Sequence, residues 1–231
     1  MSEAKSLFKA TRRKRVEPGP ALLDVEESTR TAEHRRRHDF YPTVQTDAIR
    51  ALLSRDGARI RALGAVWEPA CGSGDLVVPI RQEGIPCCAS DLVDRGCPDS
   101  WQADYFTCLR SRAPAIITNP PYNLINARDG KGAWLRHTLA MPGWTYLALL
   151  LSWDWPAARA NGLGALLDAN PFSYCYLMRW RLDFTGEGSP PQRNAWFVWS
   201  KDDPRGPGCE NPHPDFRWLD RLDNRQQEMG L

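Results

Sequence analysis

The chain contains no long uninterrupted run of apolar residues. Nowhere in its 231 residues does an apolar stretch approach the roughly 18 residues that are needed to span a bilayer. Residues 1–5 also show no hydrophobic segment of the kind that begins a secretory leader. These absences argue against a membrane-spanning or exported protein, and we expect a cytoplasmic one.

Cysteines with metal-binding spacing are also missing. The seven cysteines are odd in number and include no Cys-x-x-Cys pair, which argues against a disulfide framework and against structural zinc. We therefore expect no metal. The adjacent Cys87 and Cys88 are predicted to pack on a strand as small apolar side chains.

Charge is nearly balanced overall but unevenly distributed. The net charge is +2, yet residues 1–38 hold ten Lys or Arg against six Asp or Glu, which leaves −2 on the remainder. The basic residues cluster at 12–15 and 35–37. We predict that residues 1–38 form a flexible N-terminal arm, which is either simply solvated or contacts the phosphates of a nucleic acid.

The remaining residues alternate between short apolar strands and helical patterns. An apolar content of 42% is ample for a core, and the alternation predicts an α/β fold with a doubly wound, mostly parallel sheet. Strands are expected at 65–67, 85–90, 101–103, 115–118 and 145–152, and a C-terminal antiparallel hairpin at 172–180 and 194–199. Helices are expected at 43–53, 58–63, 76–82 and 134–141, with a broken one at 157–170.

A glycine-containing loop follows the first expected strand. Glu68-Pro69-Ala70-Cys71-Gly72-Ser73-Gly74 leads into the helix at 76–82, an arrangement that brings backbone and helix amides to a ligand. No third glycine follows, and the Glu68 carboxylate would repel a pyrophosphate. An acidic residue there suits a cationic ligand such as S-adenosylmethionine, which carries an ammonium and a sulfonium but no phosphate.

A rigid corner follows the apolar run at 113–118. Asn119-Pro120-Pro121-Tyr122 lies where the strand ends, and ligands of open α/β sheets bind outside the carboxyl ends of strands. The prolines fix the backbone and offer carbonyl oxygens, Asn119 adds an acceptor, and Tyr122 adds a ring for stacking. A planar ring with an exocyclic amino group would satisfy all of these groups.

The two motifs together resemble those of S-adenosylmethionine-dependent amino-methyltransferases, most closely the N6-adenine DNA methyltransferases of phages and bacteria. The resemblance covers roughly residues 40–201 and implies a class I, Rossmann-like catalytic domain at 39–201, with a Pro- and charge-rich tail at 202–231 that contains a short helix at 218–226. It implies S-adenosylmethionine as cofactor and DNA, duplex or single-stranded, as partner.

The resemblance and the position of each motif give a set of candidate site residues. The catalytic set is Asn119, Pro120, Pro121 and Tyr122. The cofactor-binding set is Tyr41, Pro42, Thr43, Glu68, Pro69, Ala70, Cys71, Gly72, Gly74, Asp91, Leu92, Asp104, Tyr105 and Asn119. The substrate-binding set is Tyr122, Asn123, Trp153 and Trp155.

Some of these assignments have competing interpretations. Trp153 and Trp155 flank Asp154 beyond a strand end, where they either stack on bases or simply pack in a loop, whereas Trp67, Trp196 and Trp199 are expected in the core. His137 is expected to have no role in the site.

The corner predicts that an amino or amide nitrogen is methylated, but it does not predict whether that nitrogen belongs to DNA, RNA or protein. Asn-Pro-Pro-Tyr is shared with enzymes that methylate rRNA adenine or the glutamine amide of release factors. DNA is favoured by the Phe40-Tyr41-Pro42-Thr43 segment, the short chain and the terminal hairpin. Little length remains for a target-recognition domain, so we expect short or loose sequence specificity. A catalytically inactive nucleic-acid-binding scaffold is the alternative from another class.

Overall fold

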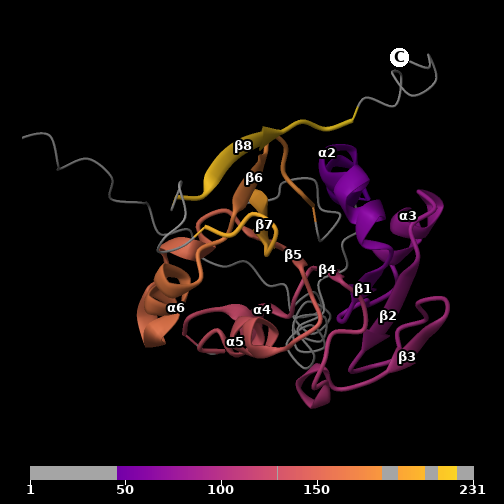
Figure 1. Ribbon diagram of the computed structural model, residues 1–231, viewed down its shortest axis with the longest axis horizontal. Coiled ribbons are helices and arrows are strands. Elements are labelled where there is room, and N and C mark those ends of the chain that lie inside the picture. The colour runs from indigo at the N-terminus through magenta and orange to yellow at the C-terminus, as the bar shows by residue number, and fades with distance from the viewer. Residues whose placement is uncertain (1–45, 129, 184–191, 206–212, 223–231) are drawn as a thin grey trace, which may run out of the picture. The chain divides into compact units, whose positions relative to one another are not determined.

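The fold is a mixed α/β arrangement around one eight-stranded sheet (Figure 1). The computed structural model describes residues 46–128, 130–183, 192–205 and 213–222. In space the strands follow the order β3-β2-β1-β4-β5-β7-β6-β8. All pairs are parallel except those made by β7, which runs opposite to both β5 and β6. The predicted doubly wound sheet with a C-terminal antiparallel hairpin is therefore confirmed.

Strands β1, β2, β4, β5, β6 and β7 correspond closely to the apolar segments of the sequence, whereas β3 and β8 do not. Their bounds are β1 (Val66–Glu68), β2 (Cys87–Asp91), β3 (Ser100–Gln102), β4 (Ala115–Thr118), β5 (Tyr146–Ser152), β6 (Tyr174–Met178), β7 (Asn194–Ser200) and β8 (Asp215–Leu219). The central β4, β5 and β7 are buried along nearly their whole length, as expected of strands that are covered on both faces.

Helices lie on both faces of this sheet. Their bounds are α2 (Asp47–Leu63), α3 (Val77–Gln82), α4 (Tyr122–Ile125), α5 (Ala133–Ala140) and α6 (Leu163–Ala169), with short 3-10 turns η1 (Tyr105–Thr107), η2 (Trp155–Ala157) and η3 (Ala160–Gly162). Among the described residues, no helix is long and apolar enough to traverse a bilayer. The predicted break at 157–170 is observed at Asn161 and Gly162, which both have positive φ.

Two hydrophobic clusters fill the space between the sheet and these helices. One joins α2 and α3 to alternate residues of the strands, such as Val66 and Ile117. The other joins α5 and α6 to the residues that point the opposite way, such as Trp67 and Ile116. Figure 1 shows α2 and α3 on one side of the strands and α4, α5 and α6 on the other. The layers hold the carboxyl ends of the parallel strands along one edge.

The first helix differs from the prediction because Gly57 does not interrupt it. Two separate helices were expected at 43–53 and 58–63, but α2 is continuous from Asp47 to Leu63. Gly57 is buried within α2. A Cβ there would lie 3.2 Å from the Arg61 guanidinium. A single glycine costs a helix about 1 kcal/mol, and the packing of Ile49, Leu52 and Ile60 outweighs that cost.

The C-terminal tail also differs from the prediction. Residues 215–219 were expected in a tail, with a helix from Trp218, but they form strand β8, which pairs in parallel with β6. The prediction of a helix at Trp218 and Leu219 is therefore wrong. The N-terminal arm at 1–38, with its two basic clusters, lies outside the described residues.

Candidate active site

The glycine-containing loop is fastened to the end of the neighbouring strand. Gly72, which has a φ of 52°, donates its N–H to the Asp91 carboxylate at 2.8 Å. The other Asp91 oxygen accepts the N–H of Val93 at 3.1 Å, and the Cys71 N–H reaches the Ser90 carbonyl at 3.0 Å. Asp91 thus fixes the path of the loop. Its neighbour Leu92, also in the cofactor-binding set, is exposed.

Gly74 turns the chain into α3 with a φ of 96°. Side chains rarely adopt this conformation, and a Cβ at this position would meet the Cys97 sulfur at 3.1 Å. The Gly74 N–H is donated to the Cys71 carbonyl at 2.8 Å, which closes the turn. The two glycines that the motif places here are therefore both used for their backbone freedom.

Glu68 is a buried carboxyl at the end of β1. Its side chain is 1% exposed, and its Oε1 accepts the Ala70 N–H at 3.0 Å. Burial raises the pKa of Glu68 to about 8; the Asp91 carboxylate adds to the rise, while the Thr118 hydroxyl and the Ala70 N–H oppose it. At neutral pH Glu68 is thus mostly protonated in this structure.

A positive ligand would suit this carboxyl. Within the described residues, neither Glu68 Oε2 nor the Thr118 hydroxyl has a hydrogen-bond partner, although both atoms are buried and the hydroxyl is near enough to lower the Glu68 pKa. A cationic group beside Oε2 would favour the charged form of Glu68 and provide the missing partner. The residues present therefore fit a cationic cofactor better than one with a pyrophosphate.

The Asn-Pro-Pro-Tyr corner lies at the end of β4 and begins α4. Pro121 is the N-cap, and its carbonyl accepts the N–H groups of Leu124 and Ile125 at 3.0 and 3.2 Å. The Pro120 carbonyl takes part in no hydrogen bond among the described residues. From the sequence, the carbonyl oxygens of both prolines were expected to be acceptors for a ligand. The Pro121 carbonyl is instead used by the first turn of α4.

The corner side chains differ in exposure. Asn119, Pro121 and Tyr122 are half-buried, Pro120 is buried, and Asn123 is exposed. Tyr122 packs partly against the cluster beneath α5. The half-buried side chains combine a fixed position with access to a ligand.

The glycine-containing loop and the corner lie beside each other. β1 and β4 are parallel neighbours, with Val66 opposite Ala115 and Trp67 opposite Ile116, so their carboxyl ends reach the same edge of the sheet. Glu68 is the last residue of β1 and Thr118 the last residue of β4, so both lie where the loop and the corner begin. Sequence reasoning missed Thr118, because a single threonine that closes an apolar strand gives no distinguishing signal.

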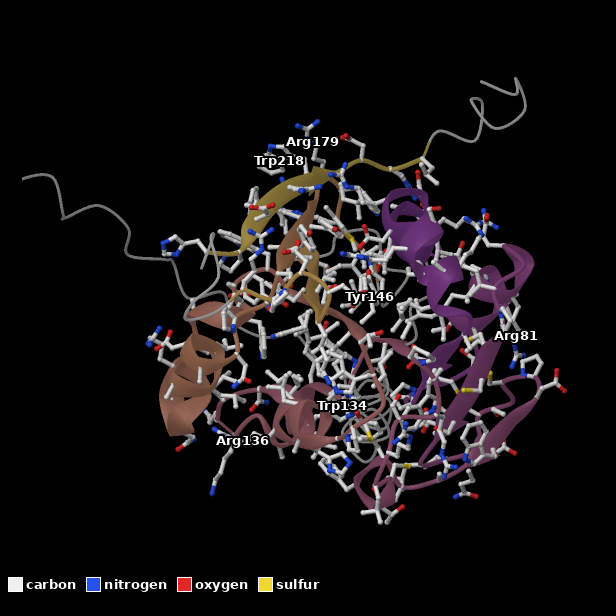
Figure 2. The ribbon with its side chains drawn as sticks, viewed as in Figure 1. Arg81, Trp134, Arg136, Tyr146, Arg179 and Trp218 are labelled. Carbon is white, nitrogen blue, oxygen red and sulfur yellow. The ribbon has the colours of Figure 1, made fainter. Side chains whose placement is uncertain are left out.

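Asp104 and Tyr105 have different environments despite being adjacent. The Asp104 carboxylate is exposed and caps η1 by accepting the Phe106 N–H at 2.9 Å. The Tyr105 ring is buried, stacks on Trp134 at 4.5 Å, and its hydroxyl pairs with Thr138 at 2.7 Å. Figure 2 labels Trp134 within this packed region. Any contact between Tyr105 and a cofactor would therefore come from its backbone.

Trp153 and Trp155 also have different environments. Trp153 is 49% exposed, whereas Trp155 is buried against Phe197. The Trp155 indole donates to the Ile125 carbonyl at 3.2 Å, which ties the loop after β5 to the end of α4. Trp155 therefore supports the corner from beneath, and only Trp153 offers a free face for stacking. The expected core residues Trp67, Trp196 and Trp199 are all buried.

Other sequence predictions concern residues near or beyond this site. Tyr41, Pro42 and Thr43 lie outside the described residues. The His137 ring contacts the Cys108 carbonyl at 3.1 Å and packs edge-on against Tyr105. These contacts give His137 a structural role.

The strand order and the site at the carboxyl edge define the fold of class I S-adenosylmethionine-dependent methyltransferases. Solved structures that match this chain include the following three, with TM-scores just above 0.5. One is a protein from Listeria monocytogenes described as a class I S-adenosylmethionine-dependent methyltransferase (TM-score 0.51, 12% identity, 79% of this chain). Another is described as a modification subunit of a type I restriction enzyme from Vibrio vulnificus YJ016 (0.51, 11%, 87%). The third is described as an RNA methyltransferase from Pyrococcus horikoshii (0.52, 12%, 67%).

These similarities concern the fold alone. The chain spans 66% of the Listeria protein, 52% of the Vibrio subunit and 84% of the Pyrococcus protein. No protein-family model and no curated protein sequence matches the chain.

Proposed function

We propose that the protein transfers a methyl group from S-adenosylmethionine to the N6 amino group of adenine in DNA. The observation that carries this proposal is the placement, on neighbouring parallel strands, of a buried carboxyl without a partner at Glu68 Oε2 and of the Asn119–Tyr122 corner. The Vibrio restriction-modification subunit, which has the same fold, supports a DNA substrate.

The cofactor would be held by the loop between β1 and α3. Glu68 would face the positive end of the molecule, and Asp91, which already positions Gly72, retains lone pairs that could accept the ribose hydroxyls. Asp104 is exposed at the next strand end, where it could meet the adenine amino group. When bound, S-adenosylmethionine supplies an electrophilic methyl on a sulfonium.

The corner would bind and orient the target base. Tyr122 would stack on an adenine that has been rotated out of a helix or presented by a single strand, at a cost of a few kcal/mol in the duplex case. Asn119 and the Pro120 carbonyl would accept the two amino hydrogens. This draws the nitrogen lone pair away from the ring and leaves it available for attack.

The rate enhancement would come from positioning. Holding the two reactants in line, with oxygen acceptors around a nitrogen that becomes positive, requires neither a metal nor a covalent nucleophile. Trp155 would contribute indirectly, because its bond to Ile125 fixes the helix that Tyr122 begins.

The test is labelled methyl transfer by the full chain, purified from a host that lacks adenine methylation. Single-stranded DNA, duplex DNA, RNA and a protein substrate with an exposed glutamine are compared, and the products are identified by mass spectrometry. We expect N6-methyladenine in DNA. Transfer to protein alone would overturn the proposal, and cofactor binding without any transfer would favour an inactive scaffold.

RNA adenine is the second candidate substrate. The Pyrococcus protein described as an RNA methyltransferase has the same fold, and the corner chemistry does not distinguish ribose from deoxyribose. In the same assay, a kcat/KM for RNA that exceeds the value for DNA of the same sequence would decide for this alternative.

A further inference from the structure

A row of aromatic and arginine side chains crosses the second half of the sheet on one face. Leu151 of β5 lies opposite Ala195 of β7, and Leu177 of β6 lies opposite the same Ala195. Two residues further along these strands, Trp153 and Arg179 therefore both flank Arg193. Two backbone-directed bonds confirm this register: the Trp153 N–H reaches the Arg193 carbonyl at 3.0 Å, and the Arg193 guanidinium reaches the Arg179 carbonyl at 3.4 Å.

Strand β8 extends this row with two exposed rings. Phe216 and Trp218 lie opposite Cys175 and Leu177, and thus on the same face as Arg179. They are 49% and 54% exposed, and their rings contact each other edge to face at 5.1 Å. The Arg179 guanidinium lies 5.1 Å from the Trp218 ring centre (Figure 2). An edge strand with two large exposed aromatic side chains is unusual unless they bind something.

Charged side chains of both signs lie along this row, and Asp154 is exposed beside Trp153. Arg179 and Arg193 are both exposed, and Asp220 is the acidic side chain that pairs with Arg179, at 3.1 Å. Guanidinium groups interleaved with aromatic faces are the combination that holds the phosphates and bases of single strands. A purely apolar protein partner would give the Arg193 guanidinium no counter-charge.

The row begins beside the candidate active site. Trp153 follows β5, which pairs with β4, and the Trp155 bond to Ile125 joins the same loop to α4. From β5 to β8 the row spans three strand spacings, about 14 Å at roughly 4.8 Å each. That is the length of roughly four nucleotides of a stacked strand at about 3.4 Å per nucleotide.

We propose that the face formed by Trp153, Arg193, Arg179, Trp218 and Phe216, here called the stacking row, binds single-stranded nucleic acid next to the target base. This rests on the proposed function for its identification of the target, but it concerns binding at a separate surface. The bases would stack on the indole and phenyl rings, and the arginines would hold the phosphates.

The experiment measures the Kd of the full chain for a fluorescent 20-nucleotide single strand by anisotropy. Trp218→Ala should raise the Kd about 5- to 150-fold, the range expected for one lost stacking contact. Trp218→Phe, which keeps a flat ring, should remain near the parent value. Trp101→Ala is the matched control, because Trp101 is a partly exposed tryptophan on the opposite edge strand, β3, and should change the Kd by less than about twofold.

Two charge variants give effects of opposite sign. Arg193→Gln should weaken binding and lower the dependence of log Kd on log salt by about 0.7 if one phosphate contact is lost. Asp220→Asn should tighten binding, because it releases Arg179 and removes a repelling carboxylate. The proposal is overturned if Trp218→Ala leaves the Kd unchanged, or if Trp101→Ala raises the Kd by the same factor. This holds even if the face is then found to bind a protein.

These outcomes separate the stacking row from the proposed methyl transfer. A parent chain that binds the strand through Trp218 but transfers no methyl would refute the proposed function and leave the stacking row intact. Transfer that proceeds with the same KM for the 20-nucleotide strand in parent and Trp218→Ala would refute the row and leave the function intact.

Discussion

The two halves of the sheet carry opposite chemistry along the same edge. Glu68 and Asp91 are the last residues of β1 and β2, and Asp104 follows β3, so three carboxyl groups lie at these strand ends. Along β5, β7, β6 and β8 lie Trp153, Arg193, Arg179 and Trp218, which are aromatic or basic. An acidic half is suited to a small cation, and a basic, aromatic half to a polyanion with stacked rings.

The division would let one fold bind the two ligands of opposite charge proposed above. β4 lies between the halves, and its corner can reach a ligand from either side. A change in the acidic half should therefore affect the cofactor, a change in the basic half the nucleic acid, and a change at β4 the reaction itself. The predictions below test this separation.

The largest effect is expected at the junction. Asn119→Ala removes a side-chain acceptor from the corner and should lower kcat by about 10²- to 10³-fold, the usual result of deleting one preorganised electrostatic group. The Kd for single-stranded DNA should stay within about threefold of the parent. Single-turnover methyl transfer and anisotropy give the two quantities.

Asn119→Asp provides the matched control for this change. It keeps an oxygen acceptor in the same place and should retain activity much better than the alanine variant. Full activity in Asn119→Ala would rule out the proposed role of the corner.

The second effect concerns the pH response of the acidic half. The folded-state pKa of Glu68, about 8, lies above its ordinary 4.5, so the protonated form stabilises the fold. The free energy of unfolding should therefore fall as pH rises from about 4.5 to about 8, by up to ~1.4 kcal/mol per pH unit from this group. Urea unfolding across this window measures the slope.

Glu68→Gln should flatten the Glu68 contribution, because the amide stays neutral at every pH. Cofactor binding gives a second reading: a cation favours the ionised carboxyl, so binding of S-adenosylmethionine at pH 7 should release a proton from the parent and none from Glu68→Gln. Calorimetry in buffers of different ionisation enthalpy detects the proton. Equal proton release in both chains would contradict the assignment.

The smallest effect concerns the turn into α3. Gly74→Ala forces a side chain into a φ of 96° and against the Cys97 sulfur at 3.1 Å, which should destabilise the fold by about 1–3 kcal/mol. It should also weaken cofactor binding and leave the Kd for DNA unchanged. Thermal unfolding and calorimetry test both effects.

Gly64→Ala separates backbone strain from the steric clash in this experiment. Gly64 has nearly the same φ, 92°, but nothing lies within 4 Å of an added Cβ. This control should be destabilised by about 1 kcal/mol and keep its cofactor affinity. If both variants lose the same stability and affinity, the contact with Cys97 has no part in shaping the loop.

The sequence predicted those features that local signals determine. Apolar strands that end in glycine or proline are recognisable without knowledge of the fold, so the core strands and the positions of the Gly72 loop and the Asn119 corner after strand ends were predictable. The helix break expected from Gly162 and Gly164 is observed at Gly162, together with Asn161, whereas Gly164 lies inside α6.

Features that depend on tertiary pairing were not predictable in this way. Strand β8 is polar at alternate positions and lies among prolines and charges, so only its pairing with β6 defines it. The difference between Trp153 and Trp155 likewise arises from packing against Phe197 and Ile125, which are distant in sequence. The same applies to Tyr105, whose ring enters the core rather than the site.

The parallel pairing of β8 with β6 also decides where a functional fragment must end. A chain cut after Lys201 would lose β8 and leave the amides and carbonyls of Tyr174–Met178 as an open rim. An unpaired strand edge of this kind can pair with strands of other molecules, so the shortened chain should aggregate. Strand β8 thus covers the edge of the sheet, besides any part it takes in holding a ligand.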